Sequence, residues 1–364
     1  MMDGFEFGEK FKLKVSGSSH GPSVELELYG CPAGVEVSVQ DIQAELDKRK
    51  PGQSILTTSR KEDDLVEVSS GIADGLTTGG AISMLIRNKN TISAHYESIK
   101  FKPRPSHADY PARVKYGMDF DLRGGAFFSA RMTAAFVMAG AVAKKFLAQK
   151  GVKTMAFTKS IGKVNVAREV SDEEILTNVY HNPVNTAAPE AAEAMVAEVE
   201  AARRDGDSVG GVVECRVTGL PPGAGDPLFK SIESTIAQAV FAIPAAKGIE
   251  FGSGFAGSAS RGSANNDEYR LKDGRVVTTS NNSGGILGGL STGMPIVFRV
   301  AFKPTASIFK EQRTVDLSSM TETTLKLEGR HDPCIAIRAV PVVEHVAAFT
   351  TADILLRPEE RGRN

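Results

Sequence analysis

Five short segments of the chain alternate apolar and polar residues with the two-residue period of a half-buried β-strand. They are residues 11–15, 24–29, 65–68, 211–217 and 297–302. Turn residues separate them, and the helical patterns are grouped elsewhere in the chain. This arrangement favours an α+β fold with antiparallel sheets over a doubly wound parallel sheet.

Four longer segments have the pattern of helices: residues 41–48, 129–149, 188–204 and 339–356. Asp41 is a plausible N-cap of the first helix, which stops before Pro51. The second is apolar almost all round, so we expect it to be buried. Pro189 and Pro341 suit the first turns of the third and fourth helices.

The chain also contains an internal echo. Residues 71–82 align with residues 285–296, and each copy runs into a strand-like apolar segment. Two related halves packed about a pseudo-twofold axis would explain the echo and predict one domain over residues 1–364. Chance similarity between two loops rich in Gly and Thr is the alternative.

Composition narrows the class of protein. The 364 residues carry a formal net charge of −1, so no bulk field draws the chain to nucleic acid or a membrane surface. Its 3 cysteines are widely spaced, without metal-ligand pairing, which fits a reduced cytoplasmic setting. The first ten residues contain no apolar stretch of signal-peptide length, so we expect no signal peptide, and we expect no segment long enough to span a bilayer.

Three histidines stand beside Gly or Pro turn signals: His20, His107 and His331. The last two also have a carboxylate and a guanidinium within three residues. Proton-transfer groups gathered with anion-binding groups predict an active site for an anionic substrate. Taken singly, each could equally be a hydrogen-bonded loop histidine.

Together with the motifs between them, these segments resemble the chorismate synthase family over nearly the whole chain. The run Gly-Arg-His-Asp-Pro-Cys at 329–334, followed by Ile-Arg-Ala-Val-Pro at 337–341, is the most specific part. Further matching motifs lie at residues 47–54, 57–64, 107–110, 115–117, 123–125, 129–131, 207–211, 246–250, 284–289 and 303–305.

The resemblance implies helices sandwiched between two antiparallel sheets and a 1,4-elimination that converts 5-enolpyruvylshikimate 3-phosphate to chorismate and phosphate. The family uses reduced FMN, with NADPH acting only indirectly to reduce the flavin. The resemblance further implies that His20 protonates the departing phosphate, that His107 lies by the flavin, and that Asp332 relays a proton as a base. A homotetramer and an external flavin reductase are expected by analogy.

The same resemblance implies two sets of binding residues. For the phosphate and two carboxylates of the substrate, we expect guanidinium forks from Arg49, Arg131 and Arg338, with Lys48 and Arg60 behind them. The expected FMN contacts are Ser129, Ala245, Gly288, Lys303, Pro304, Thr305, Ala306, Ser307 and Arg330.

Five positions depart from the family pattern: Ser18, Ile55, Phe127, Met132 and Phe136. By this alignment, apolar side chains replace three cations and two carboxylates are lost. Paired loss of this kind is typical of buried ion pairs that apolar packing can replace. Because His20, His107 and Asp332 remain, we expect a divergent but working enzyme. A catalytically weakened flavin- or anion-binding homologue is one alternative, and an obligate structural subunit is another.

Overall fold

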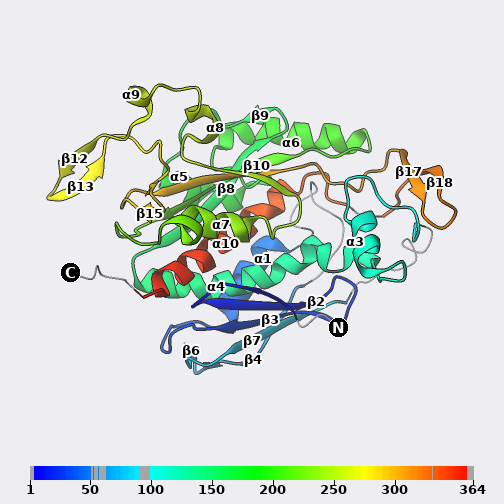
Figure 1. Ribbon diagram of the computed structural model, residues 1–364, viewed down its shortest axis with the longest axis horizontal. Helices are drawn as coiled ribbons and strands as arrows, with labels where there is room; N and C mark the ends of the chain where they lie inside the picture. Colours follow the sequence, from blue (N-terminus) through cyan, green and yellow to red (C-terminus); the bar gives the residue numbers. More distant parts are fainter. Residues whose placement is uncertain are drawn as a thin grey trace.

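Two five-stranded antiparallel sheets lie on either side of a layer of helices (Figure 1). The computed structural model describes residues 4–50, 52, 56, 63–89, 99–329 and 331–358. The first sheet has the order β1 (Phe5–Phe7), β2 (Lys12–Gly17), β3 (Ser23–Tyr29), β7 (Ile82–Arg87) and β4 (Val66–Ser70). The second has the order β9 (Val164–Asn165), β8 (Lys153–Ile161), β10 (Gly211–Thr218), β16 (Ile296–Phe302) and β11 (Ala246–Phe251).

Alternation along the strands fixes which face of each sheet meets the helices. In β3, Val24, Leu26 and Leu28 are buried, whereas Glu25 and Glu27 point to the outer face. A shift of one residue in register would turn the apolar set outward, so this pattern specifies the pairing strongly. The five strand segments expected from the sequence are all present, and the α+β class is confirmed.

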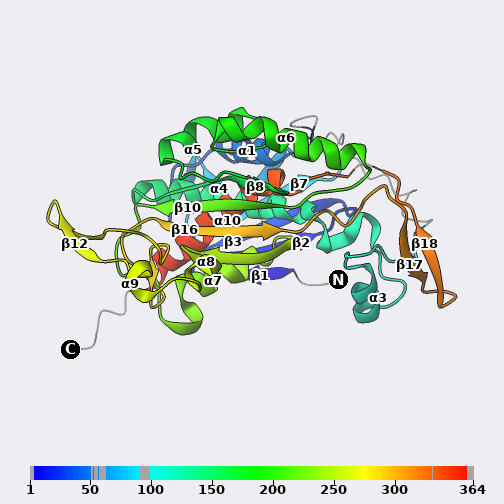
Figure 2. The same ribbon diagram turned by 90° about the horizontal axis from the view of Figure 1, so that it is seen from above.

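Helices α4 (Thr133–Gln149) and α10 (Ala336–Leu356) pack against each other in the central layer (Figure 1). Helices α1 (Val39–Arg49) and α7 (Ile232–Val240) flank them. Helix α6 (Pro189–Arg204) packs against β8 and β9 on the outer side of the second sheet, next to α5 (Asp172–Asn178) (Figure 2).

Two β-hairpins project from opposite ends of the molecule (Figure 1). One is β12 (Tyr269–Lys272) with β13 (Arg275–Thr278), near the one-turn helices α8 (Gly254–Gly257) and α9 (Gly262–Asn265). The other is β17 (Gln312–Asp316) with β18 (Thr321–Leu325), close to α3 (Asp109–Tyr116). Short 3₁₀ turns complete the elements: η1 (Arg123–Phe128), η2 (Ala130–Met132), η3 (Val179–His181) and η4 (Leu228–Lys230).

The two halves repeat one another, as the sequence echo predicts. Strand order β1-β2-β3-β7-β4 in one sheet corresponds to β9-β8-β10-β16-β11 in the other. Each copy of the echo forms a miniature hairpin, β5 (Ile72–Ala73) with β6 (Leu76–Thr77) or β14 (Ile286–Leu287) with β15 (Leu290–Ser291). Each hairpin then leads into the fourth strand of its sheet in this order. Chance similarity of two loops does not account for that shared topology.

Side-chain contacts repeat with the backbone. The hydroxyl of Thr77 donates to the carbonyl of Pro32, and that of Ser291 donates to the carbonyl of Pro221, each at 2.5 Å. Each hydroxyl also accepts a backbone N–H from the same loop, at 3.0 and 2.9 Å respectively. Both side chains are buried, so these matched bonds satisfy groups that would otherwise be costly inside the protein.

The starts of α1 and α4 differ from the expectation. Helix α1 is capped by Ser38, whose side chain accepts from Asp41 N, while the Asp41 carboxylate accepts from Ser38 N; Asp41 is therefore the third helical residue of a capping box. Helix α4 begins at Thr133, because Ser129 directs a separate 3₁₀ turn, η2, through its side chain. That turn brings Arg131 to the site described below.

Helix α10 begins at Ala336, so Pro341 lies inside the helix and not in its first turn. Proline has no N–H, which leaves the carbonyl of Ile337 without its helical donor. The side-chain amide of Asn185 donates to that oxygen at 2.9 Å. A loop from outside the helix therefore satisfies the group that the proline frees.

Helix α10 also corrects our expectation about membrane-spanning segments. Its 21 residues are long and apolar enough to cross a bilayer, but 89% of its most apolar stretch is buried inside the protein. Core helices packed on all sides have this composition. Its place between the sheets explains its apolarity.

Candidate active site

A cavity of about 560 Å³ opens where loops of both halves meet, beyond the ends of α1 and α10. Its size is typical of sites that hold small molecules. It is lined by parts of residues 104–108, 124–131, 241–247, 303–307 and 331–338, together with Ser19 and Arg49.

Two of the three residues expected to act on protons line this cavity, and the third lies beside its wall. His107 and Asp332 line it directly. His20 lies at its edge, between Ser19 and Gly124: Ser19 Oγ is 3.4 Å from His20 Nδ1, and both neighbours line the cavity. Residues far apart in sequence are thus gathered as the resemblance implies.

Backbone conformation at Gly124 makes room for His20. Its φ is +61°, and a Cβ built there would lie 1.8 Å from His20 Nδ1. Gly125 (φ +86°) and Ala126 (φ +47°) continue the left-handed turn. Glycine is therefore required at 124 both for the backbone conformation and for the approach of the imidazole.

Positive charge exceeds negative charge around the cavity. Its cationic lining residues are Arg49, Arg104, Arg131, Lys247, Lys303 and Arg338. Three carboxylates, those of Asp64, Asp109 and Asp332, pair with four of these six side chains. A ligand carrying several negative charges fits such a site.

Arg49 and Arg131 are anchored from behind by Asp64. Arg49 Nη1 lies 3.2 Å from Asp64 Oδ2, and Arg131 Nη1 contacts Asp64 Oδ1. Arg49 also donates to Thr133 Oγ1 at 3.0 Å and to Ala130 O at 2.7 Å. Burial, followed by the nearby Arg338 guanidinium, lowers the pKa of Arg49 to about 9, so Arg49 is still charged at neutral pH.

Arg338 reaches the same cavity from α10. Its Nη1 donates to Asp332 Oδ2 at 2.7 Å, and its Nε donates to Arg49 O at 3.3 Å. A cation expected to bind substrate is thus in contact with the carboxylate expected to move a proton.

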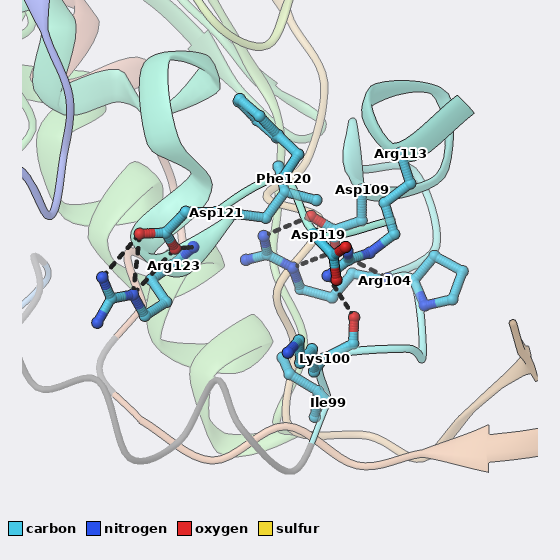
Figure 3. Close-up of a pocket in the computed structure, with 11 residues that line it drawn as sticks. Ile99, Lys100, Arg104, Asp109, Arg113, Asp119, Phe120, Asp121 and Arg123 are labelled. Atoms are coloured by element: carbon cyan, nitrogen blue, oxygen red, sulfur yellow. Dashed lines mark hydrogen bonds and ion pairs between the residues drawn. The ribbon is translucent and has the colours of Figure 1, made fainter. Parts of the chain in front are cut away.

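His107 is held by Asp109 and Arg104. The three residues form a buried cluster at the start of α3, where His107 Nδ1 lies 2.6 Å from Asp109 Oδ1. Figure 3 shows Arg104 and Asp109 in a second cavity, of about 230 Å³, together with Asp119 and Arg113. The Arg104–Asp109 pair therefore forms part of the wall of this outer cavity, while His107 lines the larger one.

Burial is the largest influence on the pKa values of His107 and His331, the two histidines that line the cavity. It lowers the pKa of His107, which Asp109 opposes and Arg104 reinforces. It also lowers the pKa of His331, again reinforced by Arg104. Burial and the neighbouring Lys247 lower the pKa of Lys303. Desolvation penalises the charged form in each case.

The residues at 303–307 fit a phosphate group in part. Lys303 lines the cavity, and no carboxylate of the described residues lies within ion-pair distance of it. Ser307 Oγ accepts from Arg104 Nη1 at 3.4 Å, which leaves its own proton for a ligand. Thr305 Oγ1, however, donates to Asp332 O at 2.8 Å, so its hydroxyl proton is already used inside the protein. Ser129, Ala245 and Ala306 also line the cavity.

Several expected site residues are not brought to this cavity. Lys48 points to the other side of α1, where it pairs with Glu45 at 2.8 Å and lines a separate cavity of about 300 Å³. Gly288 occupies an exposed turn between β14 and β15, and Pro304 is exposed outside the lining. Arg60 and Arg330 lie outside the described residues.

The departures from the family pattern have different surroundings. Phe127 lines the cavity and belongs to an aromatic cluster, with ring centroids 5.3 Å from Phe5, 5.4 Å from Phe120 and 4.6 Å from Phe128. Phe136 packs against Phe349 in the core instead. Ser18 Oγ accepts from Gly21 N in the first histidine loop, Met132 is buried, and Ile55 lies outside the described residues.

Sequence reasoning counted Asp109 and Arg104 only as charged groups near His107, and gave no role to Asp64 or Lys247. A carboxylate two residues after a candidate histidine, as in His107-Ala108-Asp109, was an available signal for the first. The others are matched to their partners only by the fold. Asp64, for example, meets Arg131 across 67 positions.

The known proteins that are similar to this chain belong to one family. The family model for chorismate synthase matches residues 11–356. The chorismate synthase of Korarchaeum cryptofilum is 48% identical over 356 residues, covering 98% of each chain. That of Methanocella arvoryzae is 50% identical, covering 98% of this chain and 95% of the relative.

Similarity extends to three dimensions. A crystal structure of chorismate synthase superposes with a TM-score of 0.77 at 30% identity, covering 96% of this chain and 92% of the other. The fold, the gathered site and these relatives lead to one conclusion: this chain belongs to the chorismate synthase family.

Proposed function

We propose that the protein converts 5-enolpyruvylshikimate 3-phosphate to chorismate and inorganic phosphate, and that it requires reduced FMN. The observation that carries the proposal is that His107 and Asp332 line one cavity with excess positive charge, while His20 lies next to two of its lining residues, Ser19 and Gly124. A substrate with a phosphate and two carboxylates needs several fixed cations at short range. The names of the relatives point to the same reaction.

Arg49, Arg131 and Arg338 are the proposed substrate clamp. Asp64 and Asp332 hold these guanidinium groups in place, so little side-chain freedom remains to be lost when a substrate binds. Preorganised cations also stabilise the charge that develops on a departing phosphate. Lys48 has no part in this proposal, because it faces away from the cavity.

His20 is the proposed general acid for the leaving phosphate, and Asp332 is the proposed base that relays the proton collected at the flavin. His20 lies against Gly124 at the edge of the cavity, and Asp332 faces the cavity beside Arg338. Two groups of opposite role at one site suit an elimination that needs a proton given at one end and a hydrogen taken at the other.

The cofactor would lie against residues 303–307, with Lys303 and Ser307 holding its phosphate and Ser129, Ala245 and Ala306 beside it. Reduced flavin supplies electron density for cleavage of the carbon–oxygen bond, which side chains alone cannot supply. We further propose that an external flavin reductase provides it, with NADPH as the electron source, and that the protein acts in the cytoplasm as a homotetramer.

A weakened flavin- or anion-binding homologue is the second candidate, because Phe127 lines the cavity where the family pattern has a cation. Anaerobic incubation with reduced FMN and 5-enolpyruvylshikimate 3-phosphate separates the candidates. Formation of chorismate and phosphate in equal amounts supports the enzyme. Flavin binding without turnover supports the binding homologue. The absence of both flavin binding and turnover would support a purely structural subunit.

A further inference from the structure

Asp109 makes contacts on both sides of its carboxylate. Its Oδ1 lies 2.6 Å from His107 Nδ1 and 2.8 Å from Arg104 Nη2. Its Oδ2 accepts from Arg104 Nε at 2.7 Å and from the backbone N–H of Arg104 at 3.0 Å. Burial opposes ionisation, but the bonds from Arg104 and His107 outweigh it and hold the pKa of Asp109 well below its usual range. Asp109 is therefore an anion at neutral pH.

The short contact between that anion and His107 determines where the ring proton lies. A deprotonated Nδ1 facing a carboxylate oxygen at 2.6 Å would place two lone pairs against each other. Nδ1 therefore carries the proton and donates it to Oδ1.

Arg104 does not compete with Asp109 for the hydrogen-bonding position at His107 Nδ1. Its Nη2 lies 3.0 Å from Nδ1 and 3.3 Å from Nε2, nearly equal distances that place the guanidinium against the ring and not in line with either lone pair. Because burial favours the uncharged ring, Nε2 is left without a proton. A methyl group on Gly125 would lie 3.5 Å from Nε2, so this nitrogen faces the turn that borders the cavity.

We propose that Asp109, held by Arg104, is a positioning residue that fixes His107 as a neutral imidazole protonated on Nδ1, so that Nε2 meets the bound ligand as an acceptor. The identity of that ligand rests on the proposed function, but the state of the ring does not. His107 would then enter the reaction first by accepting a proton or hydrogen bond at Nε2.

The charged groups facing His107 come from several elements. Asp109 favours the protonated ring, whereas Arg104, Lys303 and the neighbouring His331 disfavour it. Loss of the Asp109 charge therefore lowers the pKa of His107 further. If activity needs neutral His107, the acid limb of the kcat profile moves to lower pH in Asp109→Asn.

The direct test is a two-bond ¹H–¹⁵N correlation spectrum of the histidine rings at neutral pH, recorded on the ¹⁵N-labelled protein without flavin or substrate. His107→Gln identifies the signals of His107. We expect a protonated Nδ1 and an unprotonated Nε2. A protonated Nε2, or a rapidly exchanging mixture of tautomers, would overturn the proposal. Because no ligand is present, this result is independent of whether the protein turns over any substrate.

Kinetics supply a second readout. Asp109→Asn is expected to lower kcat roughly 10- to 100-fold, as for loss of a hydrogen bond to a charged group, with KM changed less than about twofold. Asp119→Asn is the matched control, because Asp119 lines the same outer cavity without touching His107 (Figure 3). Equal kcat in both variants would contradict the proposal. If Asp109→Asn fails to fold, the spectrum of the unsubstituted protein still decides.

Discussion

Arg49 and Arg131 share a single buried carboxylate, that of Asp64, whose side chain is fully inaccessible to solvent. Asp64 adopts a left-handed backbone conformation, with φ at +47°. Two guanidinium groups on one anion leave a net positive charge directed at the cavity. The hydrogen bonds of the Asp64 carboxylate with the described part of the chain are those with these two arginines.

Asp64→Asn therefore leaves two buried cations without their counter-charge. We expect a loss of about 3–5 kcal/mol in the free energy of unfolding, as for removal of one partner from a buried ion pair. We also expect a higher KM for the phosphorylated substrate, because the arginines lose their fixed orientation. Urea unfolding and initial rates measure the two effects. Glu67→Gln, which breaks the exposed pair with Arg87, is the control and should change neither.

Lys303→Met tests the proposed phosphate contact of the flavin. Loss of one charge-assisted contact weakens binding of reduced FMN by roughly 10- to 100-fold. Riboflavin has no phosphate, so its affinity should not change. Anaerobic fluorescence titration with both flavins gives the comparison, with Lys310→Met, which loses only an exposed pair with Asp207, as control. An equal loss for both flavins would place Lys303 elsewhere in the site.

Asn185→Ala removes the donor that compensates for Pro341 in α10. The buried carbonyl of Ile337 is then unsatisfied, which costs about 1–3 kcal/mol. Pro341→Ala restores a backbone N–H to that carbonyl, so the loss from Asn185→Ala should be much smaller in the Pro341→Ala background. The four denaturation midpoints form a double-mutant cycle. Strictly additive effects would mean that the two residues are not coupled.

The contact between Asn185 and α10 shows what the sequence could and could not predict. The apolar pattern of residues 339–356 was sufficient to predict the helix, with Pro341 in its first turn. Only the fold brings Asn185 to Ile337 and lets the helix begin three residues earlier, at Ala336. The repeat, by contrast, could be predicted from the sequence, because both copies contain a turn, a buried hydroxyl and a following strand.

The candidate site divides in the same way. Motifs carrying His107, Asp332, Arg49, Arg131 and Arg338 predicted residues that line one cavity. Lys48 was misplaced because it adjoins Arg49 in sequence, yet successive helical residues point in different directions. Asp64 carries no signal of its own role, since it acts through arginines that only the fold brings to it, whereas the place of Asp109 two residues after His107 was a usable signal.

Stability should fall on mild acidification. His107 and His331 have pKa values lowered by burial, so between their folded values and about 6.5 the unfolded chain binds more protons. The free energy of unfolding therefore decreases as pH falls below about 6.5. Urea midpoints of the unsubstituted protein and of the His107→Asn, His331→Asn double variant measure the difference. A double variant that loses as much stability as the unsubstituted protein would exclude these histidines as the cause.

The account rests on His20, His107 and Asp332 acting together in one site. The most direct test is the rate of chorismate formation under anaerobic conditions with saturating reduced FMN, for His20→Ala, His107→Ala and Asp332→Ala beside the control His181→Ala, which lies outside the cavity lining. We predict that the first three lose orders of magnitude in kcat while the control retains its rate. Full activity in either His107→Ala or Asp332→Ala would contradict the proposed site.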